Sequence, residues 1–314
     1  MKDLSIFLSA ATFVILMGYI TYEGVRTPSR DVVSDEEVAM ERIVEDDEQF
    51  MRLPITSLDL PQEASFAGEP VPMNETDVRE RFDKELQINT FLHSNTLFLM
   101  KRANRWMPQI NDILKKHNIP EDFKYLPLIE SALINDISPK DAVGFWQILK
   151  TSGKELGLEI TKEVDERYDP LKATEAACKY LKKAYAKFGN WTVVAASYNR
   201  GMGGIDRALQ DQQVKSYYDL YLNDETSRYV FRILAIKEIT EHPDKYGFKL
   251  KPEHLYQPEK IEYITVDQTI KDLVAFSKES GINYKLLKLH NPWLRDEKLT
   301  VKKGKTYRIA IPAR

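Results

Sequence analysis

A single glutamate, Glu130, ends an apolar run whose last letters are YLPLIE. Hydrocarbon neighbours make a charged carboxylate costly, so a glutamate placed there is expected to have a raised pKa and to hold a proton near neutrality. A carboxylic acid of that kind can protonate the leaving oxygen of a glycosidic bond as the bond breaks. An exposed glutamate at a helix end fits the same letters, so the interpretation depends on the motifs that follow.

Polar and aromatic motifs follow Glu130 over about a hundred residues, in the order Ser138-Pro139, AVGFWQ, DERYDP, ASYNRGMGG and ETSRYV. Their polar side chains can hold an N-acetyl group, and the aromatic residues Trp146 and Tyr198 can offer apolar faces to sugar rings. Each motif taken singly has a simpler interpretation. Trp146 and Tyr198 would fit a core, RGMGG a helix-ending turn, and Glu225 a solvated surface.

In this order the motifs resemble the goose-type lysozyme and lytic transglycosylase superfamily, in particular its membrane-bound lytic murein transglycosylase D type. The resemblance covers roughly residues 80 to 250. It implies a lysozyme-like helical domain that cleaves the β-1,4 bond between N-acetylmuramic acid and N-acetylglucosamine of peptidoglycan, without a cofactor. Glu130 would act as acid and then as base, leaving 1,6-anhydromuramic ends. The residues implied to line the saccharide groove are Ser138, Gln147, Tyr198, Asn199, Glu225 and Tyr229.

The chain departs from the family pattern just after Glu130, where the loop is one residue shorter and Asp141 replaces a usual glycine. Because aspartate tolerates a positive φ better than most residues, we expect Asp141 to rebuild the tight turn. The shortened loop keeps a second hypothesis open, a catalytically inactive peptidoglycan-binding scaffold. A third hypothesis is a hydrolase of the goose-type lysozyme kind, in which water attacks instead of a sugar hydroxyl.

The elements that must position these residues read as helices, and almost nothing between residues 80 and 245 reads as a strand. Pro120 followed by two acidic residues predicts a helix start, and Gly189 predicts a helix end. Asn190 can cap the next helix. An interruption is expected at Pro108. The region is therefore predicted to be an all-helical domain.

The C-terminal segment changes character, because KIEYITV and KTYRIAIP are short alternating β-branched and aromatic runs that flank two helical segments. This pattern predicts a βααβ unit whose first and last strands pair. With Thr269, Asn291 and Gly304 in place, the unit resembles a LysM module, which implies binding to the N-acetyl groups of peptidoglycan. The alternative is a small packing domain without a ligand.

The N-terminal segment Leu4–Ile20 carries no charge over seventeen residues, enough to reach about 25 Å as a helix. No small-x-small cleavage site follows, so an uncleaved membrane anchor is favoured over a cleaved signal peptide. An acidic stretch rich in Pro, Ser and Glu comes next and predicts a flexible tether. The predicted order is thus a membrane anchor or signal segment (1–21), an acidic flexible linker (22–78), a transglycosylase domain (79–255) and a LysM-like peptidoglycan-binding domain (260–312).

Composition limits the partners of the 314-residue chain. A net charge of −3 gives no basic field for nucleic acid, so no nucleic-acid partner is expected. Cys178 is the only cysteine and the five histidines are scattered, so we expect neither an internal disulfide nor a metal site. The resemblance implies peptidoglycan glycan strands as the partner, other cell-wall enzymes as candidates, and a place in the periplasm or cell envelope, with residues 4–20 held in a membrane.

Overall fold

The computed structural model describes residues 56–313, which are mainly helical with two small two-stranded sheets. The membrane anchor or signal segment expected at residues 1–21 lies outside the described residues, as does most of the acidic linker. Among the residues that are described, no helix combines the length and the apolar character needed to span a bilayer.

The larger part of the described chain opens with a short antiparallel hairpin, β1 (Ser65–Phe66) and β2 (Glu69–Pro70). Its helices are α3 (Thr76–Phe91), α4 (His93–Lys116), α5 (Leu126–Ser131), α6 (Lys150–Glu155), α7 (Pro170–Phe188), α8 (Trp191–Arg200), α9 (Met202–Gln212) and α10 (Asp224–Glu241). Short 3-10 helices lie at Glu121–Tyr125, Glu166–Tyr168, Pro243–Tyr246 and Pro252–His254. The prediction of a mainly helical domain is confirmed.

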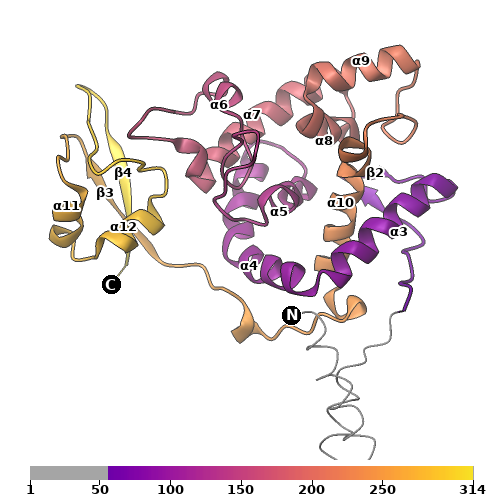
Figure 1. Cartoon of the computed structure of the whole chain (residues 1–314), viewed down its shortest axis with the longest axis horizontal. Helices are drawn as coiled ribbons and strands as arrows, with labels where there is room; N and C mark the ends of the chain where they lie inside the picture. The colour runs from indigo at the N-terminus through magenta and orange to yellow at the C-terminus, as the bar shows by residue number, and fades with distance from the viewer. Residues whose placement is uncertain (1–55, 314) are drawn as a thin grey trace, which may run out of the picture. The chain divides into compact units, whose positions relative to one another are not determined.

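Helix α10 runs through the middle of this part and packs against α3, α5 and α8 (Figure 1). Its residues Val230, Phe231, Ile233 and Ala235 have no exposed surface, and Leu234 has 2%. A helix that is apolar on more than one face must be covered on more than one side. α10 therefore fixes the positions of the helices around it, including α5, which carries Glu130.

Local sequence signals explain several helix ends. Asn190 caps α8 by accepting the backbone N–H of Val193, and Asp169 caps α7 in the same way. Gly189 ends α7 with φ 65°, a left-handed conformation that favours glycine. Pro120 precedes the 3-10 helix Glu121–Tyr125, which continues directly into α5. The predicted boundaries at Pro120, Gly189 and Asn190 are confirmed.

The interruption expected at Pro108 is wrong, because α4 continues through it. The apolar stripe of α4 extends beyond the proline, where Ile110 and Leu114 are fully buried. Packing of α4 against α7 and the 3-10 helix Glu121–Tyr125 outweighs the one backbone hydrogen bond that a proline removes. The chain instead turns at Leu92, between α3 and α4.

The linker expected to reach residue 78 is too long at its C-terminal end. Phe66 and Val78 are fully buried, and Val71 and Met73 are 6% and 7% exposed, all in the core of the helical domain. The sequence prediction rested on the average composition of this region, which is polar and acidic, so these few apolar residues did not change it. The helical domain therefore begins before residue 79 and includes the β1–β2 hairpin. Its end at residue 255 and the bounds 260–312 of the LysM-like domain stay predictions.

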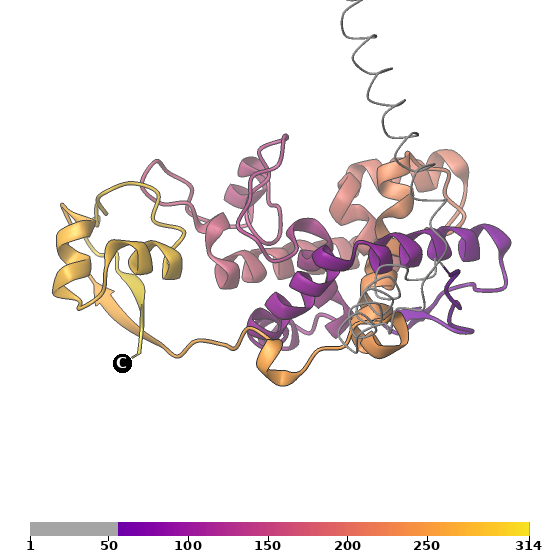
Figure 2. The ribbon, with the colours of Figure 1, turned by 60° about the horizontal axis from the view of Figure 1, so that its bottom comes forward.

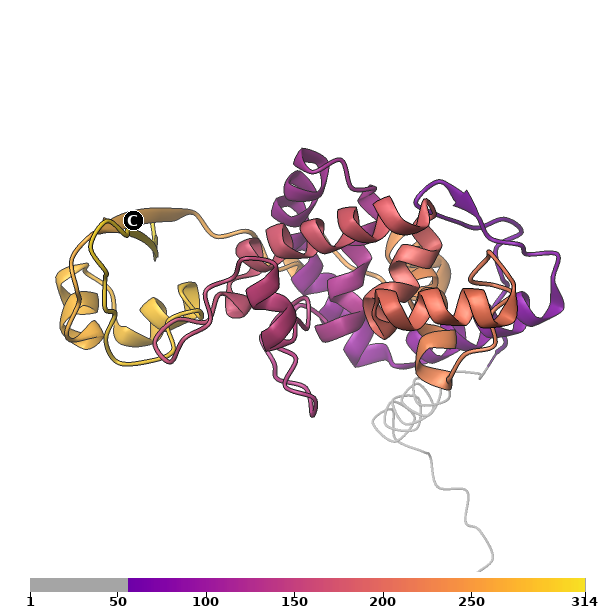
Figure 3. The same cartoon turned by 90° about the horizontal axis from the view of Figure 1, so that it is seen from above.

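The C-terminal part is a βααβ unit, as predicted, with β3 (Ile261–Val266), α11 (Leu273–Glu279), α12 (Tyr284–His290) and β4 (Tyr307–Pro312) (Figure 1). The two strands pair antiparallel, with Ile261 opposite Pro312 and Val266 opposite Tyr307. Its small core also contains Val164, which belongs to the segment between α6 and α7. Figures 2 and 3 show that segment extending from the helical domain to the C-terminal unit.

Candidate active site

Glu130 lies in the last turn of α5, a helix whose first four residues are apolar and buried. Leu126 is fully buried, and Leu128 and Ile129 are 2% and 7% exposed. Immediately after this turn, Ala132 and Leu133 both take positive φ values, 51° and 57°. Two successive left-handed residues turn the chain sharply, so the carboxyl group of Glu130 stands at the point where α5 gives way to the following loop.

The Glu130 carboxylate accepts a hydrogen bond from the phenol of Tyr229 on α10, at 2.5 Å. Burial raises the pKa of Glu130 above its ordinary value, and the charge of Glu225 acts in the same direction. The Tyr229 hydrogen bond and the Arg232 guanidinium oppose this rise in pKa but do not cancel it. The pKa of Glu130 is therefore raised, which is the direction expected from its apolar neighbours.

Two phenols stand next to Glu130 as hydrogen-bond donors, the buried Tyr229 and the half-buried Tyr198. Burial raises the pKa of both Tyr198 and Tyr229 well above the ordinary value, and the charge of Glu130 raises both further. Tyr198 donates to the backbone oxygen of Trp146 at 2.7 Å, which ties α8 to the loop after α5. Neither phenol can serve as a base near neutrality, so Glu130 is the group here that can exchange a proton.

The loop after α5 carries the predicted groove residues Ser138 and Gln147. Its backbone closes on itself, because Val143 pairs with Ile137 and with Ile148. The Ser138 hydroxyl accepts the backbone N–H of Ala142 at 3.0 Å, so it also holds the turn. Gln147 has φ 46° and donates its side-chain amide to the backbone oxygen of Gly144 at 2.9 Å.

The shortened loop does form a tight turn, and Asp141 takes φ 59° within it, as expected for the residue that replaces glycine. The loop is also fastened to α5, because Ser131, next to Glu130, donates its hydroxyl to the backbone oxygen of Phe145 at 3.0 Å. The loop is therefore attached directly beside Glu130.

A second cluster of predicted site residues lies at the exposed edge of the site. Asn199 on α8 donates to the Glu225 carboxylate at 3.0 Å and accepts from the Thr226 hydroxyl at 2.8 Å. Lys140, in the loop after α5, lies 3.8 Å from the other Glu225 oxygen. The structure thus joins Glu130 to Tyr229 and Asn199 to Glu225, with α8, α10 and the loop all contributing.

The interpretation of Trp146 as a face for sugar rings is wrong. The side chain has no exposed surface, and its indole N–H donates to the Thr174 hydroxyl at 2.8 Å inside the core. Tyr198 lies against Trp146, with ring centroids 6.1 Å apart, and remains partly exposed. Trp146 supports Tyr198 and the loop from below instead of contacting a ligand.

Sequence reasoning missed Arg232, whose charge acts on Glu130 and which donates to the Ile129 backbone oxygen at 2.6 Å. A signal was present in the spacing. Glu225, Tyr229 and Arg232 lie at positions i, i+4 and i+7, which share one face of a helix. Once Glu225 and Tyr229 had been placed in the groove, the same face pointed to Arg232.

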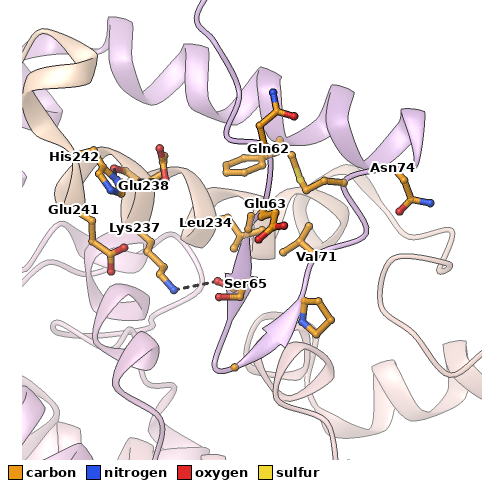
Figure 4. Close-up of a pocket in the computed structure, with 15 residues that line it drawn as sticks. Gln62, Glu63, Ser65, Val71, Asn74, Leu234, Lys237, Glu238, Glu241 and His242 are labelled. Atoms are coloured by element: carbon orange, nitrogen blue, oxygen red, sulfur yellow. Dashed lines mark hydrogen bonds and ion pairs between the residues drawn. The ribbon is translucent and has the colours of Figure 1, made fainter.

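A separate hollow of about 660 Å³ lies between the N-terminal hairpin and the C-terminal half of α10 (Figure 4). Its lining includes Glu63, Val71, Leu234 and Glu241, and none of the predicted site residues. Lys237 crosses its edge and donates to the Ser65 backbone oxygen at 3.0 Å. This hollow is therefore distinct from the Glu130 site, although α10 contributes to both.

Two family models match the chain. Residues 108–220, which include Glu130 and the loop after it, match the transglycosylase SLT domain. Residues 262–314 match the soluble lytic transglycosylase C-terminal LysM-like domain. Together with the helical fold and the βααβ unit described above, these matches show that the chain carries a transglycosylase SLT domain followed by a LysM-like domain. The resemblance inferred from the motifs is confirmed.

A distant relative is the membrane-bound lytic murein transglycosylase D of Escherichia coli (strain K12). The two are 32% identical over 195 residues, 59% of this chain and 42% of the relative, so the chain spans less than half of that relative's length. A putative tributyltin chloride resistance protein of Alteromonas sp. (strain M-1) is 29% identical over 128 residues, 40% of this chain and 62% of that protein.

Among solved structures, an inactive mutant of the lytic transglycosylase Slt of Pseudomonas aeruginosa matches with a TM-score of 0.35 and 17% identity, covering 49% of this chain and 26% of that one.

Proposed function

We propose that this chain is a peptidoglycan lytic transglycosylase, which cleaves the β-1,4 bond between N-acetylmuramic acid and N-acetylglucosamine and leaves a 1,6-anhydromuramic end. One observation carries the proposal. Within an SLT domain, Glu130 ends an apolar helix, its pKa is raised by burial, and the Tyr229 phenol holds its carboxyl group in place.

In the first step Glu130 acts as a general acid. Its proton passes to the oxygen that links the two sugars, while the bond from that oxygen to C1 of the muramic residue breaks. A raised pKa keeps the acid protonated at the pH where this transfer is needed. The carbonyl oxygen of the substrate's own N-acetyl group stabilises C1, so a second protein carboxylate is not required as nucleophile.

In the second step the Glu130 carboxylate acts as a base. It takes the proton from the O6 hydroxyl of the same muramic residue, and O6 attacks C1 to close the 1,6-anhydro ring. Glu130 is protonated again at the end, and no water is consumed. During the interval when Glu130 is charged, the Tyr229 hydrogen bond and the Arg232 charge both favour the carboxylate.

The other predicted site residues are proposed to hold the glycan strand. Asn199 and Glu225 offer amide and carboxylate groups at the exposed edge, and Gln147 and Ser138 offer polar groups on the facing loop. Tyr198 is half-buried in the same region. Orientation of the N-acetyl group by such contacts brings it close to C1 before the bond breaks.

The LysM-like unit is proposed to bind peptidoglycan and so to keep the catalytic domain at the wall. A second binding element raises the effective concentration of substrate at the groove without a contribution to the chemical step. We also propose that the protein works in the cell envelope, held by the apolar segment 4–20.

Mass spectrometry of digested peptidoglycan tests the proposed reaction. Purified sacculi treated with the full chain should release fragments with anhydromuramic ends, lighter by one water than the corresponding reducing fragments. Glu130→Gln, which keeps shape and hydrogen bonding but cannot deliver a proton, is the matched control and should release almost none. Mainly reducing muramic ends would identify a hydrolase, and binding without release by the wild type would identify an inactive scaffold.

A further inference from the structure

Residues 159–168, between α6 and α7, are shared by the two parts of the described chain (Figures 2 and 3). The N-terminal end of this segment contacts the LysM-like unit, and its C-terminal end contacts the loop that carries Ser138 and Gln147. We call residues 159–168 the bridging segment. Such a segment can transmit a displacement from one contact to the other if both contacts fix its position. The hydrogen bonds and apolar contacts on both sides of the bridging segment do this.

Toward the LysM-like unit, the bridging segment makes both apolar and backbone contacts. Val164 is 2% exposed and lies in the core of the unit, beside Leu294 and Trp293. The backbone N–H of Asp165 donates to the Trp293 oxygen at 2.9 Å, and that of Arg295 donates to the Glu163 oxygen at 2.8 Å. These contacts resemble strand pairing and fix the register between the two parts.

Side chains of the bridging segment reinforce this docking. The Glu163 carboxylate accepts from the backbone N–H of Thr300 at 2.7 Å and from its hydroxyl at 3.1 Å. The Glu159 carboxylate accepts from the Tyr307 phenol at 3.1 Å and pairs with Lys305. Hydrogen bonds to charged groups are stronger than those between neutral ones, so both glutamates add to the docking.

Toward the catalytic loop, the bridging segment ends in a buried ion pair. The Arg167 guanidinium donates to both oxygens of Asp165, at 3.0 and 2.7 Å. Its remaining terminal nitrogen donates to the backbone oxygens of Asp141, at 3.1 Å, and Ile148, at 3.2 Å. One planar group therefore holds the start and the end of residues 141–148.

The backbones of the bridging segment and the loop also touch directly. A Cβ atom added to Gly144 would lie 2.1 Å from the Arg167 backbone oxygen, so only glycine fits there. The side-chain amide of Asn135 donates to the Tyr168 oxygen at 3.0 Å. Gln147, a predicted substrate residue, bonds to the oxygen of the same Gly144. The position of Gln147 thus depends on the position of Arg167.

We propose that Asp165 and Arg167 are positioning residues for the catalytic loop, and that docking of the LysM-like unit on the bridging segment holds them in place. This inference rests on the proposed function of the Glu130 site. It gives the LysM-like unit a second role, because an undocked unit would leave Asp165 without its backbone partner and the loop less firmly held. Displacement of a substrate-positioning group by about 1 Å can lower kcat on the order of 100-fold.

Two variants separate the contact with the LysM-like unit from the contact with the catalytic loop. Arg167→Lys keeps the charge but offers one compact ammonium in place of a planar fork, so it cannot hold Asp165, Asp141 and Ile148 together. Glu163→Ala acts only on the docking, since Glu163 contacts the LysM-like unit at Thr300 and not the loop. Lys162→Ala is the matched control, because Lys162 is exposed and its ion pair with Asp296 contributes little.

Hydrogen–deuterium exchange in the full chain measures the coupling without reference to activity. The amides of Val143, Gly144 and Ile148 are hydrogen-bonded within the loop, so they report how firmly it is held. Both Glu163→Ala and Arg167→Lys should speed their exchange, whereas Lys162→Ala should not. Faster exchange confined to the bridging segment and the LysM-like unit would overturn the coupling. If Glu163→Ala changes no exchange at all, Val164→Asp replaces it as the undocking variant, and an unchanged loop there overturns the coupling too.

Kinetics on short soluble glycan strands provides the second readout, because such strands remove the tethering role. We expect Arg167→Lys to lower kcat about tenfold and Glu163→Ala about threefold, with smaller changes in KM. The double variant should resemble Arg167→Lys alone, because both act through one contact. Additive losses, or a loss in KM alone, would contradict the proposal. A wild type without anhydro products would refute the proposed reaction, while the exchange data would still decide the coupling.

Discussion

The Glu130 site has two regions, each with a glutamate. We call Glu130 and the buried Tyr229 the floor, and Glu225, Asn199 and Lys140 the rim, where Glu225 is exposed to solvent. In the floor, Glu130 is bonded to Tyr229, whose side chain is 1% exposed. At the rim, Glu225 is exposed, bonded to Asn199 and close to Lys140. Both glutamates are predicted site residues, but only Glu130 directly follows buried apolar residues of its own helix.

The comparison shows that the raised pKa of Glu130 comes from burial and not from the side-chain type. Glu225 and Tyr229 are one turn apart on α10, yet the side chain of Glu225 is exposed and that of Tyr229 is buried in the core. The same helix therefore carries the exposed Glu225 and the buried hydrogen-bond partner of Glu130. The predictions below test that division.

The largest effect is expected for the floor. Glu130→Gln should lower kcat by about 10²- to 10⁴-fold, the range for loss of a general acid, while binding to peptidoglycan persists. Turbidity clearing of sacculi and a pull-down with insoluble peptidoglycan measure the two properties. Activity within a few-fold of wild type would remove Glu130 from the mechanism.

The next effect concerns the floor hydrogen bond. Because the Tyr229 phenol favours the charged carboxylate, Tyr229→Phe should raise the pKa of Glu130 further and move the alkaline limb of the kcat/KM profile to higher pH. At neutral pH we expect kcat to fall about tenfold, since one hydrogen bond that positions the acid is lost.

Tyr217→Phe is the matched control for this variant, because the buried Tyr217 phenol donates to the Thr226 backbone oxygen at 2.9 Å. Its alkaline limb should stay where it is in the wild type. If the alkaline limb of Tyr229→Phe moves to lower pH instead, the hydrogen bond raises the pKa of Glu130, which contradicts the prediction.

A smaller effect is expected for the rim. Glu225→Gln should leave kcat within about twofold and raise KM by up to about fivefold, because exposed charged contacts are worth no more than about 1 kcal/mol. Initial rates on soluble glycan strands give both constants. A loss in kcat comparable with that of Glu130→Gln would contradict the division between floor and rim.

The smallest effect is on stability. A carboxyl group whose pKa is raised by folding contributes stability that is present below its unfolded pKa and is lost as the pH rises through the folded pKa. Glu130→Gln carries no such group, so at neutral pH it should be more stable than the wild type by on the order of 1 kcal/mol. Thermal unfolding between pH 3 and pH 8 should show this gap closing toward acid; a constant gap would point to packing instead.

Local chemistry made much of the fold predictable. The caps at Asn190 and Gly189 and the paired strands of the C-terminal unit follow from interactions within a few residues or from simple alternation. Pro108 shows the limit, because its effect depends on what the rest of α4 packs against. So does Phe66, an apolar residue in a polar stretch, whose burial depends on the helices that cover it.

The site divides in the same way. Glu130 could be found because its apolar neighbours precede it directly in the sequence. For Trp146 the choice between a sugar-binding face and the core stayed open, because neighbouring residue types do not show which side of the loop faces the core; the structure places it in the core. Arg167 went unnoticed because its acceptors, Asp141 and Ile148, are backbone oxygens about twenty residues away, and backbone acceptors leave no trace in a sequence.

The most direct test of the central claim is a titration of the glutamate carboxyl carbons by ¹³C NMR in the full chain. The Glu130 signal is assigned by its absence from Glu130→Gln, and the Glu225 signal by its absence from Glu225→Gln. The account predicts that Glu130 titrates above the ordinary value for glutamate, at the pH of the alkaline limb of kcat/KM. A Glu130 pKa at or below the ordinary value would contradict it.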